Sequence, residues 1–177
     1  MKLAITALAL VLTTGMSDQA RPDFSGNWTS SGPGVWTGRG NSGTDSLQVG
    51  RFPMTMVISQ DATTLTVDEQ YVAGSELTGV IYPRNTLSYP LDGRTQSNKM
   101  PIAGPRDEYG VAPAEFRCHW DAQQLVAAFS VSVPGETLPR RYERKIWLDS
   151  DGTLMMQTLR VGTPHSLTHV FKREVKR

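Results

Sequence analysis

Apolar and polar residues alternate one by one along most of the chain between Met54 and Phe171. This period of two places successive side chains on opposite faces of a β-strand, and the wider spacing of amphipathic helices is nearly absent. Three segments repeat one arrangement, in which an acidic turn separates two strand-like runs and a leucine opens the second: Met54–Val67, Phe116–Phe129 and Lys145–Met156. Each segment predicts a β-hairpin.

The same pattern predicts about ten short antiparallel strands joined by consecutive hairpins. A meander of this kind usually closes on itself, because pairing of the last strand with the first removes the exposed edges. We therefore expect an all-β fold, a single antiparallel up-and-down β-barrel of about eight to ten strands. The expected strands are residues 25–30, 53–60, 64–72, 76–82, 86–91, 115–121, 124–133, 139–149, 153–161 and 166–174.

Two stretches of the chain lack the alternation. Ser31–Phe52 is rich in glycine, and Gly93–Pro113 is rich in proline, glycine and charge. We expect both to be long irregular loops. Loops of such length are often lids or binding loops, and the alternative is that they are insertions without a role.

Alternation also predicts which side chains line the interior of the barrel. We expect the apolar members of each alternating set to point inward, so that Cys118 is buried. The expected interior sets are Met54, Met56 and Ile58; Leu65, Val67 and Tyr71; Phe116, Cys118 and Trp120; and Leu125, Ala127, Phe129, Val131 and Val133.

The expected strand at 139–149 carries charge on both of its faces. We assign the face with Tyr142, Arg144, Ile146 and Leu148 to the interior. A guanidinium cannot lose its charge and is costly to desolvate unless it is paired. Arg144 is therefore expected to face the acid of a ligand, to pair with Glu69, or to extend to the barrel mouth.

The first twenty residues have the pattern of a secretory signal peptide. Lys2 supplies a positive start, Leu3–Leu12 is apolar but too short to span a bilayer, and Gly15–Ala20 is small or polar. We expect residues 1–20 to be cleaved, residues 21–177 to form the barrel domain, and the protein to be periplasmic or secreted. An N-terminal apolar strand is the alternative interpretation.

Composition restricts the partners and the source of stability. Cys118 is the single cysteine, so no internal disulfide can form and the core must supply the stability. The net charge of +1 argues against nucleic acid or a charged membrane as the main partner. No later segment has the length and hydrophobicity of a membrane span. The composition leaves the oligomeric state open.

Phe24-Ser25-Gly26-Asn27-Trp28 resembles the opening of lipocalin-like barrels, the calycin group, whose first strand begins with Gly-x-Trp. The resemblance implies that Trp28 plugs one end of a barrel under a basic residue of the last strand, here Lys172 or Arg173. With its signal sequence and basic final strand, the chain resembles small secreted bacterial proteins that begin Phe-Ser-Gly-x-Trp. Many of those proteins have no established activity, so the resemblance concerns the fold.

A second resemblance is to nitrobindins, ten-stranded haem-binding barrels with a Gly-x-Trp-x-Gly-x-Gly string and a ligating histidine near the C-terminus. Gly34-Val35-Trp36-Thr37-Gly38-Arg39-Gly40 fits the string, and His169 lies late in the chain. The rest of that family's pattern is missing. The resemblance implies haem at His169 as an alternative to our main expectation, which is that the protein holds no cofactor.

The sequence predicts no metal site. His165 and His169 would lie about 13 Å apart on one face of a strand, too far apart to share an ion. His119 would point away from Cys118. Motifs for phosphate binding, dinucleotide binding and a nucleophile elbow are also absent.

Binding of a small molecule is the first functional hypothesis. A barrel of this size can enclose one ligand, and the seven methionines and the interior aromatic residues would give it apolar walls. We predict a secreted or periplasmic lipocalin-like barrel that binds a small apolar or amphipathic molecule, and a solid barrel is the alternative. The expected ligand-binding residues are Met54, Met56, Tyr71, Tyr89, Trp120, Phe129, Tyr142, Arg144 and His169.

An enzyme is the second hypothesis. In a barrel interior of low dielectric constant, one side chain can transfer a proton without any sequence motif. The reaction would be a cofactor-free isomerisation, cyclisation or lyase step on a small hydrophobic substrate, with Tyr71, Tyr142, Arg144 or His169 as proton donor or oxyanion partner. A third hypothesis is an envelope domain that binds protein through its long loops.

Overall fold

A computed structural model describes residues 20–30, 35–37, 54–73, 80–81, 84–103, 109–164 and 166–174. The described residues form twelve β-strands and contain no helix. The strands are β1 (Gly26–Ser30), β2 (Val35–Thr37), β3 (Met54–Gln60), β4 (Thr64–Ala73), β5 (Val80–Ile81), β6 (Asn85–Pro90), β7 (Thr95–Ala103), β8 (Tyr109–Asp121), β9 (Gln124–Val131), β10 (Arg140–Leu148), β11 (Leu154–Arg160) and β12 (Ser166–Arg173).

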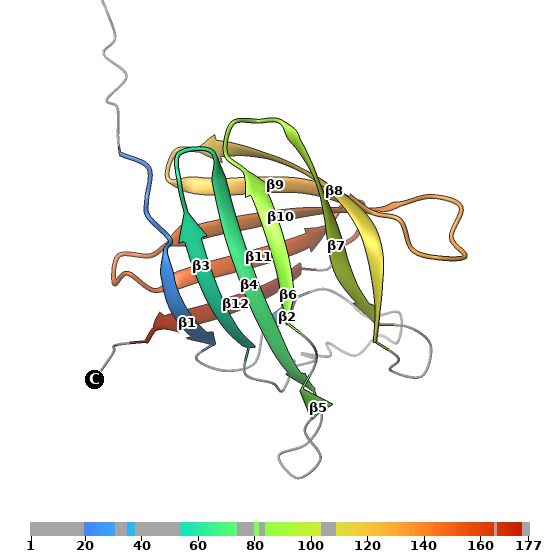
Figure 1. The fold of residues 1–177 in the computed structure, drawn as a ribbon, viewed down its shortest axis with the longest axis horizontal. Helices are drawn as coiled ribbons and strands as arrows, with labels where there is room; N and C mark the ends of the chain where they lie inside the picture. The colour runs from blue at the N-terminus through green and yellow to red at the C-terminus, as the bar shows by residue number, and fades with distance from the viewer. Residues whose placement is uncertain are drawn as a thin grey trace, which may run out of the picture.

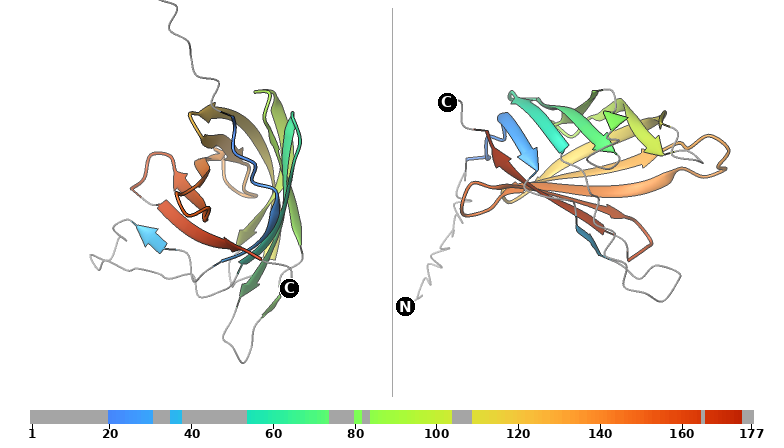
Figure 2. Two further views of the ribbon diagram at one scale, coloured as in Figure 1. Left: turned by 90° about the vertical axis from the view of Figure 1, so that its left-hand side faces the viewer. Right: turned by 90° about the horizontal axis from the view of Figure 1, so that it is seen from below.

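Ten of these strands form a nearly closed antiparallel barrel. Starting at β7, neighbouring strands pair in the order β7, β8, β9, β10, β11, β12, β1, β3 and β4, and β6 then pairs with β4. The first and last strands pair antiparallel, with Trp28 opposite Arg173. Figure 1 shows β3, β4 and β6 crossing β9–β12 at a steep angle, and Figure 2 shows the strands curving around on themselves. The predicted all-β, up-and-down barrel is confirmed.

A seam remains between β6 and β7, where no strand pairing joins the described residues. The Asn98 side chain takes the place of a neighbouring backbone there. Its Oδ1 accepts a hydrogen bond from the Ser88 N–H (2.8 Å), and its Nδ2 donates to the Ser88 carbonyl (2.9 Å). A groove of about 790 Å³ runs over the seam, with Asn85 and Asn98 in its lining. One side chain therefore joins the two edges of the barrel.

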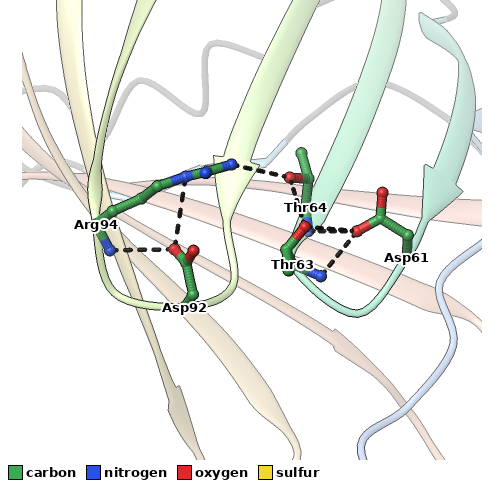
Figure 3. A network of polar contacts seen from close by, with 5 residues as sticks. All are labelled: Asp61, Thr63, Thr64, Asp92 and Arg94. Atoms are coloured by element: carbon green, nitrogen blue, oxygen red, sulfur yellow. Dashed lines mark hydrogen bonds and ion pairs between the residues drawn. The ribbon is translucent and has the colours of Figure 1, made fainter.

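Tight turns join the strands at one end, which we call the closed end. At the β3–β4 turn, Oδ1 of Asp61 accepts hydrogen bonds from the backbone N–H of Thr63 (2.7 Å) and of Thr64 (2.8 Å). These bonds lower the pKa of Asp61. Arg94, beside Asp92 in the β6–β7 turn, reaches the hydroxyl of Thr64, so the two turns are linked (Figure 3).

The core contains the side chains that alternation assigned to the interior. Phe116 and Cys118 of β8 are buried, whereas Arg117 and His119, which follow them in turn, are exposed. The same alternation holds on β3, β4 and β10, and on β9 apart from Val126, which is buried on the outward face. The largest fully buried side chains are Trp28, Tyr89, Phe24, Phe116, Phe171, Met56, Leu65, Leu87, Leu125, Ile146 and Leu154.

The expected loop at Gly93–Pro113 is wrong, because most of it forms the β7–β8 hairpin. The strand β7 lies at the seam, so its polar residues and Pro101 are compatible with a sheet edge, where a missing backbone donor breaks no ladder. The other expected loop, Ser31–Phe52, lies outside the described residues except for β2, which pairs with β12. The expected signal peptide at residues 1–20 also lies outside them, apart from residue 20.

Candidate functional site in the barrel interior

We call the second end of the barrel the mouth. The β9–β10 connection (residues 132–139) and the described part of the β11–β12 connection (residues 161–164) both lie there. Because strands run alternately between the two ends, the inward residues in the middle of β4, β10, β11 and β12 lie between the closed end and the mouth. Polar side chains collect in this part of the interior.

Arg144 is the central residue of that collection. It belongs to the inward face of β10 and is 5% exposed. Its Nε donates a hydrogen bond to the hydroxyl of Thr158 on β11 (2.9 Å), and its Nη1 donates to the hydroxyl of Tyr89 on β6 (2.5 Å). The guanidinium also lies 5.5 Å from the centre of the Phe129 ring. The prediction that Arg144 faces the interior is confirmed.

Glu69 and Asn85 extend the polar region on the opposite wall. Glu69 is completely buried on β4, and Asn85, on β6, donates a hydrogen bond from Nδ2 to its Oε1 (3.4 Å). The charges of Glu69 and Arg144 both act on the hydroxyl of Tyr89. The buried acidic side chain of Glu69 and the buried basic side chain of Arg144 thus both lie near Tyr89, as expected if Glu69 balances the Arg144 charge inside the barrel.

His169 faces the same interior from β12. Its register partner on β11 is the buried Met156, and its ring centre lies 5.8 Å from that of Phe171. Its Nδ1 is buried and has no hydrogen-bond partner within the described part of the chain. Burial, and then the positive charge of Arg144, lower the pKa of His169 to about 4. The imidazole is therefore neutral at physiological pH.

Two further groups are held in their neutral forms by burial. Desolvation raises the pKa of the Tyr89 hydroxyl to about 12, although the Arg144 charge opposes the shift. Burial raises the pKa of the Cys118 thiol to about 12. Tyr89 is thus available as a hydrogen-bond donor or acceptor, whereas Cys118 is an unreactive core residue.

An aromatic stack forms one wall beside the polar region. The Phe129 ring stacks on Phe116 on one side (4.5 Å between centres) and on Tyr142 on the other (5.2 Å). Tyr89 meets Phe116 edge to face at 5.1 Å. The apolar wall and the polar groups therefore share residues, and Tyr89 belongs to both.

We call Arg144, Tyr89, Thr158, Glu69, Asn85 and His169 the interior polar cluster. Of the ligand-binding residues expected from sequence, the structure brings Tyr89, Phe129, Tyr142, Arg144 and His169 together, and Met56 lies opposite Glu69 in the β3–β4 register. Met54 and Tyr71 pair across β3 and β4, but their side chains lie outside the described residues.

Trp120 lies apart from the cluster, at the closed end. Its ring stacks on Phe24 (5.9 Å between centres) and is covered by the guanidinium of Arg21 at 5.5 Å. Trp120 is the last interior residue of β8 before the turn. Alternation assigned its face correctly but gave no information on its height, which is its position along the barrel axis between the closed end and the mouth. In this structure it helps to seal the end opposite the mouth.

Sequence reasoning missed Asn85 and Thr158 as members of the cluster. Both occupy inward positions of their strands: Asn85 lies in phase with Leu87 and Tyr89, and Thr158 with Leu154 and Met156. The alternation of β6 and β11 therefore contained the signal. It was overlooked because a polar residue near a strand end is more often exposed than buried.

The feature that the lipocalin-like resemblance implied for Trp28 is present at the closed end. Trp28 is fully buried, its Nε1 donates to the Phe24 carbonyl (2.9 Å), and the guanidinium of Arg173 lies 4.8 Å from its ring centre. Gly26, with φ of +146°, brings the chain close to that guanidinium, because a side chain there would meet Nε of Arg173 at 3.4 Å. Arg173, and not Lys172, is thus the basic cover.

Neither a metal site nor a helical membrane span is found in the described residues. No group of three or more histidine, cysteine, aspartate or glutamate side chains lies close enough there to hold an ion. No helix in that part of the chain is long and apolar enough to cross a bilayer.

Comparison with known proteins bears on the fold only. No family model matches the chain, and no curated protein matches it. Among solved structures, the chain is similar to a secretary abundant heat soluble (SAHS) protein from Ramazzottius varieornatus, with 11% sequence identity and a TM-score of 0.47. The match covers 85% of this chain and 95% of that protein. Given its low identity and TM-score, we draw no functional argument from it.

Proposed function

We propose that this protein binds one small amphipathic molecule in the mouth half of its barrel. The polar group of the ligand would contact Arg144, Tyr89 and His169, and its apolar part would lie against Phe129 and Tyr142. The geometry of Arg144 carries the proposal, because two hydroxyls fix its planar guanidinium beside the Phe129 ring, where it can hold an oxygen acceptor of a ligand.

The chemistry of the cluster supports a ligand that accepts hydrogen bonds. Two neutral hydroxyls, on Tyr89 and Thr158, hold the guanidinium in one orientation. A planar, fixed guanidinium recognises carboxylate and related oxygen acceptors with two parallel hydrogen bonds. Glu69 restricts the charge that the ligand can carry. Its own charge near Tyr89 would repel a strongly anionic ligand unless the Glu69 carboxyl were protonated.

A role outside the cytoplasm fits this proposal. The signal-like pattern of residues 1–20 supports a periplasmic or secreted carrier, in which the core and not a disulfide supplies the stability. An up-and-down barrel suits such a role, because it keeps a ligand away from water without needing a cofactor.

Extraction of the purified protein with organic solvent, followed by mass spectrometry, tests whether a small molecule is bound. Titration with the anionic fluorophore 1-anilinonaphthalene-8-sulfonate then measures the affinity of the interior for an amphipathic molecule. Arg144→Met is expected to weaken binding by about tenfold or more, the loss of one charged hydrogen bond. Arg117→Met, at an exposed position on β8, is the matched control. Equal affinities of the two variants, with no extracted molecule, would contradict the proposal.

Proton transfer by His169 is a second candidate function. Its neutral imidazole, with a buried Nδ1 that has no partner within the described part of the chain, has the form required of a general base. Turnover of a small hydrophobic substrate that is lost in His169→Gln and in Tyr142→Phe, while fluorophore binding is kept, would favour the enzyme over the carrier.

Haem binding at His169 is the remaining alternative. An axial haem ligand must be a neutral histidine, and His169, which has Met156 and Phe171 beside it, meets that requirement. An absorbance band in the Soret region of the purified protein, lost in His169→Ala, would support this alternative.

A further inference from the structure

Two exposed apolar side chains lie together at the mouth, outside the interior polar cluster. Leu138 is 77% exposed and Val161 is 53% exposed, the two highest values among the large apolar residues that the structure describes. Both line an open groove of about 550 Å³ between the β9–β10 and β11–β12 connections. Figure 1 shows the β9–β10 connection, in orange, projecting beyond the barrel.

Positive charge surrounds these two side chains. Three arginines, Arg140, Arg141 and Arg160, line the groove, and Glu136 is its one acidic lining residue. Glu136 is ion-paired with Arg140, and the arginines lower its pKa, so it remains charged and neutralises one guanidinium. Within the described part of the chain no carboxylate forms an ion pair with Arg141 or Arg160. With three arginines and one glutamate in its lining, the groove carries a net positive charge.

This combination fits one kind of partner. Apolar side chains that project from the surface, with guanidinium groups close by, match the layered chemistry of a bilayer, where acyl chains lie beneath anionic headgroups. A stable protein interface needs roughly 800 Å² on each partner with a packed apolar centre, more than these two apolar side chains provide.

We propose that the mouth tip, formed by Leu138, Arg141, Arg160 and Val161, docks on the surface of a membrane that contains anionic lipids. Leu138 and Val161 insert among the headgroups, and Arg141 and Arg160 contact lipid phosphates. The near-neutral net charge of the whole chain argued against a charged membrane, but it averages over this local excess of positive charge. Docking in this way turns the mouth toward the lipid.

Docking does not depend on the ligand-binding proposal, since none of the four residues belongs to the interior polar cluster. Arg144→Met is therefore expected to leave membrane binding unchanged. The two proposals can fail separately, because one is measured by binding of the fluorophore and the other by binding to vesicles.

Co-sedimentation of the full chain with vesicles tests the proposal. Vesicles of phosphatidylcholine alone are compared with vesicles that also contain phosphatidylglycerol, at low and at physiological ionic strength. We expect binding only to the mixed vesicles, weakened by salt. Arg141→Gln and Arg160→Gln should each reduce the affinity by about fivefold, the effect of one basic residue at an anionic surface. Leu138→Asn should reduce it by a similar factor.

Matched variants keep the experiment decisive. Val57→Asn changes an apolar residue of 43% exposure on the wall of β3, and Arg117→Gln changes an exposed arginine on β8. Both should bind the mixed vesicles like the wild type, and circular dichroism should show that every variant is folded. Three results would overturn the proposal: no binding to either vesicle, equal losses in the control variants, or a dimer in solution that Leu138→Asn dissociates.

Discussion

At the scale of single residues, the buried Arg144 links strands that are distant in the sequence. Arg144 holds three strands together through its own side chain, because it belongs to β10, bonds Thr158 on β11 and bonds Tyr89 on β6 across the interior. Removing it would leave the buried Tyr89 hydroxyl, the half-buried Thr158 hydroxyl and the nearby Glu69 charge without the guanidinium that they surround. The cost of a buried group that loses its partner is larger than the net benefit of the original bond.

Arg144→Met is therefore expected to lower the free energy of unfolding by about 2–4 kcal/mol. Urea denaturation followed by tryptophan fluorescence gives the value. Arg117→Met should change stability by no more than about 0.5 kcal/mol, because the exposed Arg117 makes one long bond to Thr95. If both variants lose the same amount, the guanidinium in the interior has no special structural role.

His169 makes stability depend on pH. Its pKa is about 4 in the folded protein against an ordinary value of 6.5, so the unfolded chain binds more protons between these values. Stability from this residue is complete above pH 6.5 and is lost as the pH falls toward 4, by at most about 3 kcal/mol. The positive charge of Arg144 faces the imidazole and acts in the same direction.

The measurement compares unfolding free energies of wild type and His169→Gln from pH 7 to pH 4. Carboxylates such as Asp61, whose pKa is also lowered, destabilise both proteins equally at acid pH, so the difference between the two curves isolates the histidine. The wild type should lose more stability than the variant as the pH falls. Parallel curves would mean that His169 titrates normally.

At the scale of elements, the seam between β6 and β7 is bridged by the Asn98 side chain, which bonds the Ser88 backbone. Asn98→Asp keeps an acceptor for the Ser88 N–H but removes the donor to the Ser88 carbonyl. We expect a loss of about 1–2 kcal/mol and faster hydrogen exchange at β6 than at β4. Ser97→Ala, at the exposed neighbouring position, should leave the exchange rates unchanged. Unaltered exchange in Asn98→Asp would show that other contacts close the seam.

Alternation predicted the strands whose two faces differ most in polarity. On β8, buried Phe116 and Cys118 alternate with exposed Arg117 and His119, and on β10 the same rule placed the charged Arg144 inside. It failed on β7, because a strand at a seam has polar residues on most positions and tolerates Pro101. The local pattern of such a strand does not differ from that of a loop.

The height of a residue in the barrel could not be predicted in the same way. Trp120 and Phe129 both point inward, yet one seals the closed end and the other lies under Arg144. Height depends on the register between strands that are distant in sequence, such as Tyr89 on β6 and Arg144 on β10. A period of two carries no information on that register.

At the scale of the whole molecule, pairing of the first strand, β1, with the last strand, β12, holds the barrel together. Beside this pair, the N–H of Glu174 donates a hydrogen bond to the carbonyl of Asn27 (2.9 Å). Closure over so long a separation in sequence brings a large entropic cost during folding and predicts slow folding for a chain of this size. Contacts at the junction should therefore affect the stability of the entire barrel.

Arg173→Ala tests that expectation at the junction. Arg173 covers the ring of the buried Trp28, and the contact between a guanidinium and an indole face contributes about 0.5–2 kcal/mol, more when it is shielded from water. We expect the loss of this contact to lower the urea concentration at the midpoint of unfolding. Fluorescence and circular dichroism should still change together, because we expect the barrel to unfold as one cooperative unit. Lys172→Ala, at the neighbouring exposed position opposite Thr29, is the control and should have no effect. Two separate transitions in Arg173→Ala would instead show that β1 can detach while the rest of the barrel remains folded.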